Sequence, residues 1–385
     1  MRVAVVGAGP AGLYFTYLWK KRHPQSKIEL YEQNPADATW GFGVVFSDRA
    51  LEFLRSDDPE TADFIAPHME IWRNMTLDLK GEQVVLDGVG FSAIGRLRLL
   101  QLLQQRVHAV GVEPRFRKLV NSVEELGEVD LIVGADGLNS VVRRAREGEF
   151  ATSLTYAANK FAWFGTTKRF ETLSQTFVET DLGTFNAHHY RYAPDMSTFL
   201  VECDSKTWER YGFAGKSIDE SKSICESVFA DTLDGHPLVS NKSIWRNFPW
   251  LRNEHWHFGN MVLVGDALHT AHFSIGSGTR LAMEDVIALV EALEEETDIA
   301  RGLALYEARR RPLVATLVEA AQASAQWYES FPAHMGLAPL DFAYSYVTRS
   351  GRIDDARLRA MSPRFMDRYE AARRTRIGKL SGAQG

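Results

Sequence analysis

The chain has 385 residues, a net charge of −6, 45% hydrophobic residues and 24% charged residues. This composition is that of one large or two ordinary globular domains, and the negative charge argues against nucleic acid as the main partner. No apolar run reaches the roughly 18 residues that a membrane span needs. The first apolar strand begins almost at Met1, so we expect no signal peptide and a cytoplasmic location. Cys203 and Cys225 are the only cysteines, which predicts two reduced thiols.

The first predicted strand, Val3–Val6, runs into a glycine-rich turn and then into a helix. Gly7, Gly9 and Gly12 have the G-x-G-x-x-G spacing. In this motif the first glycine allows a tight turn, the second lets the backbone approach a pyrophosphate, and the third lets helix and strand pack closely. A second strand, "KIELYE", ends at Glu32, about 20 residues later, where a carboxylate can accept ribose hydroxyls. These features predict a site for the ADP half of NAD or FAD.

Two more strand–turn–helix junctions follow, "DLIVGADGLNSVVRR" from Asp130 and "MVLVGDALHTAHFSIGSGTRLAMED" from Met261. A flavin protein must hold the ribityl chain and the isoalloxazine ring as well as the ADP half, so the repeated junctions favour FAD over NAD. In the last junction we expect Asp266 to bind ribityl or phosphate oxygens, and Gly276 and Gly278 to bring backbone N–H groups to the ring. The helix expected to begin near Thr279 would point its positive end at the N1/O2 edge of the flavin.

The order of the motifs resembles that of the class A FAD-dependent aromatic hydroxylases. The matching segments are the glycine turn with Glu32, an R-x-x-L-x-x-x-L helix beginning at Arg96, Asp136-Gly137, Gly265-Asp266, and "YEARRRP" at Tyr306–Pro312. The phrases "FGVVFSD", "NKFAWFGT" and "MSTFLVEC" are similar to the flavin domain of salicylyl-CoA 5-hydroxylases and 2-aminobenzoyl-CoA monooxygenases, and less closely to the violacein-pathway hydroxylase. Phe273 stands where most relatives have proline, a departure that this narrower group shares, and Arg280 stands where most have asparagine.

The resemblance implies an α/β fold with a Rossmann-like FAD-binding domain of the GR2 type. That domain would comprise residues 1–150 and 256–300, with an inserted β-sheet substrate domain at 151–255 and a C-terminal helical region at 301–385. It also implies flavin contacts from Gly43, Val44, Arg96 and Asp136. Gly43 and Val44 would belong to a mobile loop around Gly41 and Gly43. NADH or NADPH would reduce FAD transiently, and O₂ would then supply the oxygen for hydroxylating an aromatic ring. Larger members of the group carry a reductase-like domain, which we do not expect in this chain.

The segment "AHHYRY" in the expected substrate domain supplies the candidate catalytic residues His188 and Tyr190. Strand alternation places residues 188, 190 and 192 on one face and 189 and 191 on the other. A histidine on the pocket face could accept a proton from a substrate hydroxyl or amine. A thioester of coenzyme A (CoA) would also need cations, for which the candidates are Lys160, Lys168, Arg169 and Arg191.

Several alternatives remain beside an aromatic acyl-CoA 5-hydroxylase. The substrate could be a free aromatic acid or an indole derivative, and the protein could be a simple FAD oxidase or dehydrogenase. It could also be a non-catalytic flavin-bound subunit that serves a separate reductase. A flavin halogenase is disfavoured, because "EHWHFGN" lacks the W-x-W-x-I-P phrase of that class. The i, i+3 pair His269 and His272 has no accompanying ligand cluster, so we expect no metal site.

Overall fold

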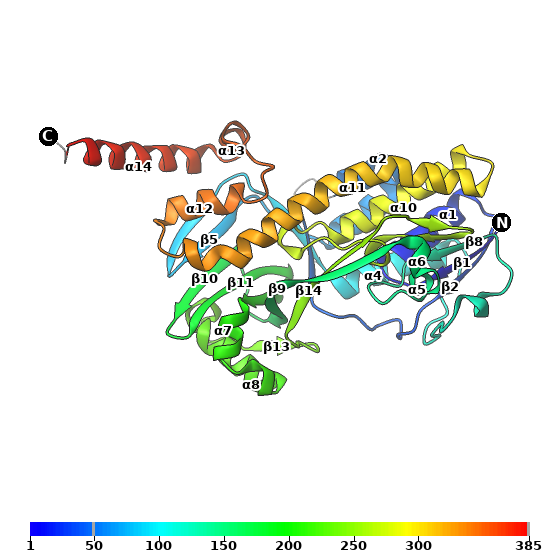
Figure 1. Cartoon of the computed structure of the whole chain (residues 1–385), viewed down its shortest axis with the longest axis horizontal. Helices are drawn as coiled ribbons and strands as arrows, with labels where there is room; N and C mark the ends of the chain where they lie inside the picture. Colours follow the sequence, from blue (N-terminus) through cyan, green and yellow to red (C-terminus); the bar gives the residue numbers. More distant parts are fainter. Residues whose placement is uncertain (48–50, 383–385) are drawn as a thin grey trace.

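The computed structural model describes residues 1–47 and 51–382, and it contains two large β-sheets joined by long helices (Figure 1). The first sheet has five strands, and its four longer strands are paired in parallel. Its strands, in sheet order, are β15 (His257–Phe258), β16 (Met261–Leu263), β8 (Leu131–Gly134), β1 (Arg2–Val6) and β2 (Lys27–Tyr31). Three of these strands end in the three predicted junctions, so the turns meet at one edge of the sheet, as in other doubly wound folds.

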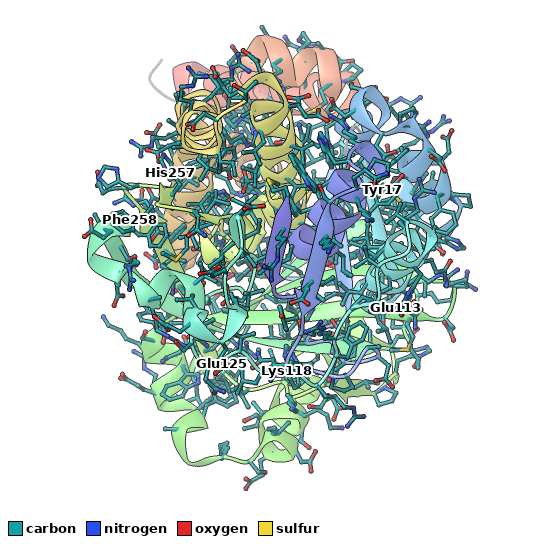
Figure 2. The ribbon with its side chains drawn as sticks, turned by 90° about the vertical axis from the view of Figure 1, so that its right-hand side faces the viewer. Tyr17, Glu113, Lys118, Glu125, His257 and Phe258 are labelled. Carbon is teal, nitrogen blue, oxygen red and sulfur yellow. The ribbon has the colours of Figure 1, made fainter. Side chains whose placement is uncertain are left out.

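Figure 2 looks along the molecule onto this first sheet. His257 and Phe258 mark one edge, where β15 pairs with β16. The segment containing Glu113 and Lys118 runs along the opposite edge, where Arg115 bridges Tyr31 of β2. Strands β1, β8 and β16 are buried almost throughout, which explains why they read in the sequence as continuous apolar runs.

The second sheet is mainly antiparallel, and it contains the predicted substrate segment. Its strands, in sheet order, are β13 (Leu238–Ser240), β9 (Thr152–Thr166), β12 (Met196–Cys203), β11 (Gly183–Ala193), β10 (Leu173–Thr180), β5 (Met75–Leu79) and β6 (Glu82–Leu86), and β14 (Arg246–Asn253) also pairs with β9. The hairpin of β5 and β6 was not expected here, because it precedes residue 150. It joins the sheet through parallel pairing of β5 with β10.

A small third sheet connects the two large ones. It consists of β3 (Gly43–Ser47), β7 (Phe91–Gly95) and β4 (Glu70–Trp72), with β7 in the middle. Its strand β7 leads directly into α4 (Arg96–Ala109), the helix predicted from the R-x-x-L-x-x-x-L pattern. Strand β3 contains Gly43 and Val44, so these two residues belong to an ordered sheet edge.

Helices cover the first sheet and extend along the second. Around the first sheet lie α1 (Pro10–Arg22), α2 (Glu52–Asp57), α3 (Pro59–Ile65), α5 (Val141–Ala145), α6 (Glu147–Phe150) and α10 (Gly278–Glu295). The outer face of the second sheet carries α7 (Ser205–Arg210), α8 (Ile218–Val228) and α9 (Ala230–Leu233). The 32-residue helix α11 (Ile299–Ser330) runs along both sheets (Figure 1).

The C-terminal region is helical, as predicted. It contains α12 (Pro339–Thr348), α13 (Asp355–Met361) and α14 (Pro363–Gly382), and α14 projects from the body of the molecule in Figure 1. Phe365 and Met366 at the start of α14 are buried against the β5–β6 end of the second sheet. The ending "RRTRIGKLSGAQG" predicts a helix that frays into a disordered end, and residues 383–385 of this segment lie outside the described residues. None of the described helices is both long and apolar enough to cross a membrane.

Candidate active site

The glycine turn between β1 and α1 has the geometry that its spacing predicts. Gly7 has a φ of +100°, and a Cβ atom there would collide with the backbone of Ala135. A Cβ atom on Gly12 would collide with the carbonyl oxygen of Gly7. Around Gly9, by contrast, a Cβ atom would meet no described atom within 4 Å. Gly7 and Gly12 are therefore required by packing, whereas Gly9 leaves open space for a ligand at the start of α1.

Glu32 follows β2 and lies beside this turn. One carboxylate oxygen accepts a hydrogen bond from the Ala8 backbone N–H at 2.9 Å. The other accepts hydrogen bonds from the backbone and side-chain N–H groups of Asn34, both at 2.8 Å. These bonds fix the carboxylate next to the glycine turn, and binding of the adenosine ribose by Glu32 stays a prediction.

Asp136 occupies the turn after β8, where one of its carboxylate oxygens caps α5. That oxygen accepts a hydrogen bond from the Val141 N–H at 2.6 Å. The other oxygen is buried and has no hydrogen-bond partner among the described residues. Burial raises the pKa of Asp136 above its ordinary value, although the hydrogen bonds from Ser140 and Val141 oppose this. Asp136 thus retains one acceptor for a further donor.

Arg143 connects the second junction to the third. Arg143 is 4% exposed, and its guanidinium donates to the Ala267 carbonyl at 2.9 Å and to the Leu138 carbonyl. The arginine-rich segment that follows Asp136 therefore contains a buried structural arginine.

The last junction places Gly276 and Gly278 at the start of α10, within one residue of the expected helix start at Thr279. Gly276 has a φ of +60°, and a Cβ atom there would lie 3.0 Å from Cγ1 of Val45 in β3. This close approach requires glycine. Gly276, Gly278 and Thr279 all line a large cavity, and contact of these residues with the flavin stays a prediction.

A buried carboxylate that the sequence analysis missed holds this junction in place. Asp285 is completely buried in α10, and one of its oxygens accepts hydrogen bonds from the Gly265 N–H at 3.2 Å and from His269 at 2.8 Å. Its other oxygen accepts from Arg310 of the "YEARRRP" helix at 2.9 Å. Burial acts to raise the pKa of Asp285, but the charges and hydrogen bonds of His269 and Arg310 outweigh it and hold the pKa below its ordinary value.

The two histidines of "HTAH" therefore have different surroundings. His269 is bonded to Asp285, whereas the ring of His272 stacks on Trp250 with centroids 5.8 Å apart. No group of three or more histidine, cysteine, aspartate or glutamate side chains could hold a metal ion within residues 1–47 and 51–382.

All three junctions border one cavity of about 1650 Å³ that extends from the glycine turn to the second sheet. This volume exceeds the roughly 300–1,000 Å³ of an ordinary ligand pocket. Arg96 at the start of α4 and Asp266 after β16 both line it. Burial lowers the pKa of Arg96 and raises that of Asp266, and the attraction between the two charges partly offsets both shifts. Neither side chain has a hydrogen-bond or ion-pair partner within 4 Å among the described residues.

These residues fit FAD. The open space at Gly9 and the positive end of α1 suit a pyrophosphate, because helix N-termini favour anions. The unpaired guanidinium of Arg96 suits a phosphate, and the carboxylate of Asp266 suits hydroxyl donors such as those of a ribityl chain. Gly43 and Val44 line the same cavity. The donor and acceptor groups left unpaired in the cavity thus match those that FAD presents.

The second sheet lines the other part of the cavity, and it does so with the face of β11 that carries His188 and Tyr190. His188 and Tyr190 of β11 line the cavity, whereas His189 points to the other face, where it contacts Thr176 and the ring of Phe170. Alternation along the strand explains this arrangement.

His188 is buried and hydrogen-bonded at both ring nitrogens. Nδ1 lies 2.9 Å from the Gln175 amide nitrogen, and Nε2 lies 3.4 Å from a carboxylate oxygen of Glu202. Burial is the main cause that lowers the pKa of His188 to about 3 and raises that of Glu202. His188 is consequently neutral at pH 7, and a direct role as a proton acceptor would require one of these bonds to break. Its catalytic role stays a prediction.

Tyr190 connects the second sheet to β3. Its hydroxyl donates to the Gly43 carbonyl at 3.0 Å, and the Gly43 N–H donates to Thr198 of β12 at 2.9 Å. Burial raises the pKa of Tyr190 above its ordinary value. Two hydrogen bonds thus join the second sheet to Gly43, in the segment that was predicted to be mobile. A catalytic role for Tyr190 also stays a prediction.

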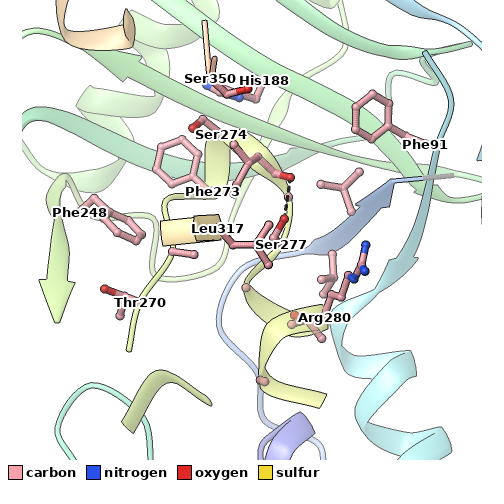
Figure 3. A pocket seen from close by; sticks show the side chains of 18 of the residues that line it. Phe91, His188, Phe248, Thr270, Phe273, Ser274, Ser277, Arg280, Leu317 and Ser350 are labelled. Carbon is pink, nitrogen blue, oxygen red and sulfur yellow. Dashed lines mark hydrogen bonds between the residues drawn. The ribbon is translucent and has the colours of Figure 1, made fainter. Parts of the chain in front are cut away.

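Phe273 lies where the last junction meets the second sheet. Its ring centroid is 4.9 Å from that of Phe161 and 5.3 Å from that of His188. Figure 3 shows the Phe273 ring between Phe248 and His188, with Arg280 lower in the same pocket. A proline could not provide this aromatic wall, so the departure from most relatives changes the shape of the pocket.

The four cations suggested for a CoA thioester do not line the cavity, and this prediction was wrong in its choice of residues. Lys168 pairs with Asp234 at 2.7 Å, and Arg191 pairs with Glu70 at 2.6 Å. Lys160 bonds to Asn247, and Arg169 is exposed. Strand alternation alone could not tell which of these side chains reach the cavity. The cations that line it are arginines on other elements, Arg246 among them.

The position of Asp266 leads to a prediction for the Asp266→Ala variant. Removal of a charge-assisted hydrogen bond costs about 1.5–3 kcal/mol, so FAD affinity should fall by about one to two orders of magnitude. Titration of the apoprotein with FAD, followed by flavin fluorescence, measures this change. Asp181→Ala, in the exposed turn between β10 and β11, is the matched control and should bind FAD normally. Unchanged FAD affinity in Asp266→Ala would remove Asp266 from the site.

Comparison with known proteins agrees with this geometry. Residues 98–321 match the family model described as an FAD binding domain. The chain is 41% identical to salicyloyl-CoA 5-hydroxylase of a Streptomyces species, over 96% of this chain and 73% of the relative. It is 35% identical to the 3-hydroxy-4-methyl-anthranilyl-(aryl-carrier protein) 5-monooxygenase of Streptosporangium sibiricum, over 86% of this chain and 90% of the relative. It is 32% identical to protodeoxyviolaceinate monooxygenase of Chromobacterium violaceum, over 91% of this chain and 94% of the relative.

Solved structures show the same fold at lower sequence identity. The tetrameric form of 2-methyl-3-hydroxypyridine-5-carboxylic acid oxygenase aligns with a TM-score of 0.69 and 18% identity, over 94% of this chain and 95% of that one. PqsL of P. aeruginosa in complex with 2-aminobenzoylacetate aligns with a TM-score of 0.68 and 19% identity, over 87% of this chain and 98% of that one. The family match, the relatives and the cavity agree, and the chain belongs to the FAD-binding-domain family of FAD-dependent aromatic monooxygenases.

Proposed function

We propose that this monooxygenase hydroxylates an aromatic acyl thioester, such as salicylyl-CoA or 2-aminobenzoyl-CoA, at C5. The observation that carries the proposal is a cavity that combines the FAD-complementary groups with an aromatic-walled space beside the second sheet. The names of the two relatives with the highest identity cited above both describe an aromatic acyl group on a carrier, and both specify position 5.

The chemistry of such a substrate also favours C5. An electrophilic oxygen attacks ring carbons that a hydroxyl or amino group makes electron-rich. In an ortho-hydroxy or ortho-amino benzoyl thioester, C5 is para to that donor and meta to the electron-withdrawing thioester. Both substituents therefore direct attack to the same carbon. The overall reaction consumes one O₂ and one NAD(P)H with a proton, and it yields the phenol, NAD(P)⁺ and water.

When bound, FAD supplies the electron transfer from NAD(P)H and the activation of O₂. The chain's own residues hold and shield the reactants. Arg96 and Asp266 hold the cofactor, and the rings of Phe273 and Phe161 give the substrate ring an apolar wall. Neutral His188 adds no charge beside the substrate. This surface keeps water away from the reacting carbon, which limits loss of the activated oxygen.

The test supplies salicylyl-CoA, 2-aminobenzoyl-CoA, the corresponding free acids and an indole to the purified holoenzyme. We expect the two thioesters to stimulate NAD(P)H oxidation and to give 5-hydroxylated products that carry ¹⁸O from labelled O₂. If free acids or indoles alone couple oxidation to hydroxylation, the thioester proposal fails and the monooxygenase assignment stands. The isolated chain needs no added reductase in this proposal, so NAD(P)H oxidation that requires a second protein would contradict that part of it.

A further inference from the structure

The rim of the cavity between β14 and α11 carries an arginine without a partner. Arg246 of β14 lines the cavity, is exposed, and has no hydrogen-bond or ion-pair partner among the described residues. Its guanidinium lies 5.9 Å from the centroid of the Phe161 ring, which in turn lies 4.9 Å from that of Phe273. The Phe161 ring thus lies near both Arg246 and Phe273, and Phe273 is the residue that borders the last junction.

The side chains around Arg246 are aromatic and apolar. Tyr156 of β9 is 59% exposed and Leu313 of α11 is 59% exposed, and both line the same cavity. Phe248 and Leu317 continue this surface inward, and Figure 3 shows them on the same side of the pocket. Large exposed apolar side chains beside a cavity are typical of a binding surface.

The charges in the cavity are separated along its length. Among the described residues, the carboxylates that line it are Asp266 and Glu284, and both belong to the flavin junction. Glu284 is paired with Arg280 and Arg310. The rim at Arg246 therefore has a positive charge with no lining carboxylate beside it, which favours an anionic group.

We propose that this rim, formed by Arg246, Tyr156 and Leu313, binds the nucleotide end of the CoA thioester. The inference rests on the proposed function and identifies the part of the site that recognises the carrier. The phosphates of CoA pair with Arg246, and the planar adenine lies against the exposed ring of Tyr156. The flexible pantetheine arm then runs over Phe248 and Phe161 and places the thioester at Phe273. Arginine suits this role because its planar guanidinium recognises phosphate and stacks on rings.

A second pair of arginines in the cavity is a weaker candidate. Arg352 and Arg357 also line it, and Asp354 and Asp355 lie between them in the sequence. The Arg357 guanidinium also donates to the Arg352 carbonyl at 3.2 Å. In the described part of the chain the Arg246 guanidinium has no hydrogen-bond partner, and no aspartate or glutamate adjoins it in the sequence, so it is the stronger candidate for a phosphate ligand.

The experiment compares two thioesters of the same acid on the oxidised holoenzyme, salicylyl-CoA and salicyl-pantetheine, of which only the first has phosphates and adenine. Perturbation of the flavin absorbance gives Kd without turnover. We expect Arg246→Ala to raise Kd for salicylyl-CoA by roughly 3- to 10-fold and to leave Kd for salicyl-pantetheine unchanged. Tyr156→Ala should show the same selectivity. Arg252→Ala, an exposed arginine on the same strand that lies outside the cavity, is the matched control.

The possible failures are distinguishable. If wild type neither binds nor hydroxylates either thioester, the proposed function itself fails. If wild type hydroxylates both thioesters but Arg246→Ala weakens both equally, or neither, the rim does not recognise the nucleotide and this inference alone is overturned. It is also overturned if Arg246→Ala changes only the KM for NAD(P)H, or if Arg357→Ala shows the selectivity expected of Arg246→Ala.

Discussion

A Gly9→Val variant should fold normally and purify without FAD. A Cβ atom at Gly9 would meet no described atom within 4 Å, and the backbone there has a φ of −73° and a ψ of −177°, which valine adopts readily. The added side chain would instead fill the space in which a pyrophosphate must approach the N-terminus of α1. We expect FAD affinity to fall by at least about two orders of magnitude, which corresponds to about 2.7 kcal/mol.

The ratio of flavin to protein absorbance and the far-ultraviolet circular dichroism spectrum together measure this effect. Gly12→Ala is the contrasting variant, because its Cβ atom would collide with the Gly7 carbonyl and so should disturb folding as well as binding. A fully flavin-loaded Gly9→Val protein would refute the assignment of this turn to the pyrophosphate.

The second large effect is expected at Asp285, on stability. Asp285→Ala would leave the buried side chains of Arg310 and His269 without their shared partner. Removal of one partner of a buried ion pair lowers the free energy of unfolding by about 3–5 kcal/mol. The urea unfolding midpoint should fall accordingly. FAD affinity should fall too, because Asp285 also holds the Gly265 N–H at the start of the flavin junction.

The same two helices supply a control. Glu295 of α10 forms a bidentate ion pair with Arg309 of α11, with nitrogen–oxygen distances of 2.6 and 2.8 Å. Both side chains are about half exposed. Exposed pairs contribute little to stability, so Glu295→Ala should leave the unfolding midpoint nearly unchanged. Equal effects of the Asp285 and Glu295 variants would contradict the role assigned to Asp285.

The first sheet and its three turns could be predicted because their signals are local. A buried parallel strand is a continuous apolar run, and the conformations of Gly7 and Gly276 permit little besides glycine. Asp285 could not be found in this way. Its partners lie 16 to 25 positions away, and only the packing of α10 against α11 brings them together.

The substrate side of the cavity was predicted less completely for the same reason. Alternation along β11 correctly separated His188 from His189. It could not indicate that Glu202 of β12 would lie behind His188, because that contact depends on how two strands align. Nor could it identify Arg246, which reaches the cavity from β14, a different strand that pairs with β9.

The parallel pairing of β5 with β10 has a consequence for how the protein is made. Met75 lies beside Leu173, so the β5–β6 hairpin leaves the ribosome about a hundred residues before its neighbour in the sheet. The hairpin also packs against Phe365 and Met366, which are synthesised about 280 residues after it. An unpaired strand edge with an uncovered apolar face is prone to aggregate during this interval. Slower translation or lower temperature during expression should therefore raise the soluble yield, since non-local pairing of this kind forms slowly.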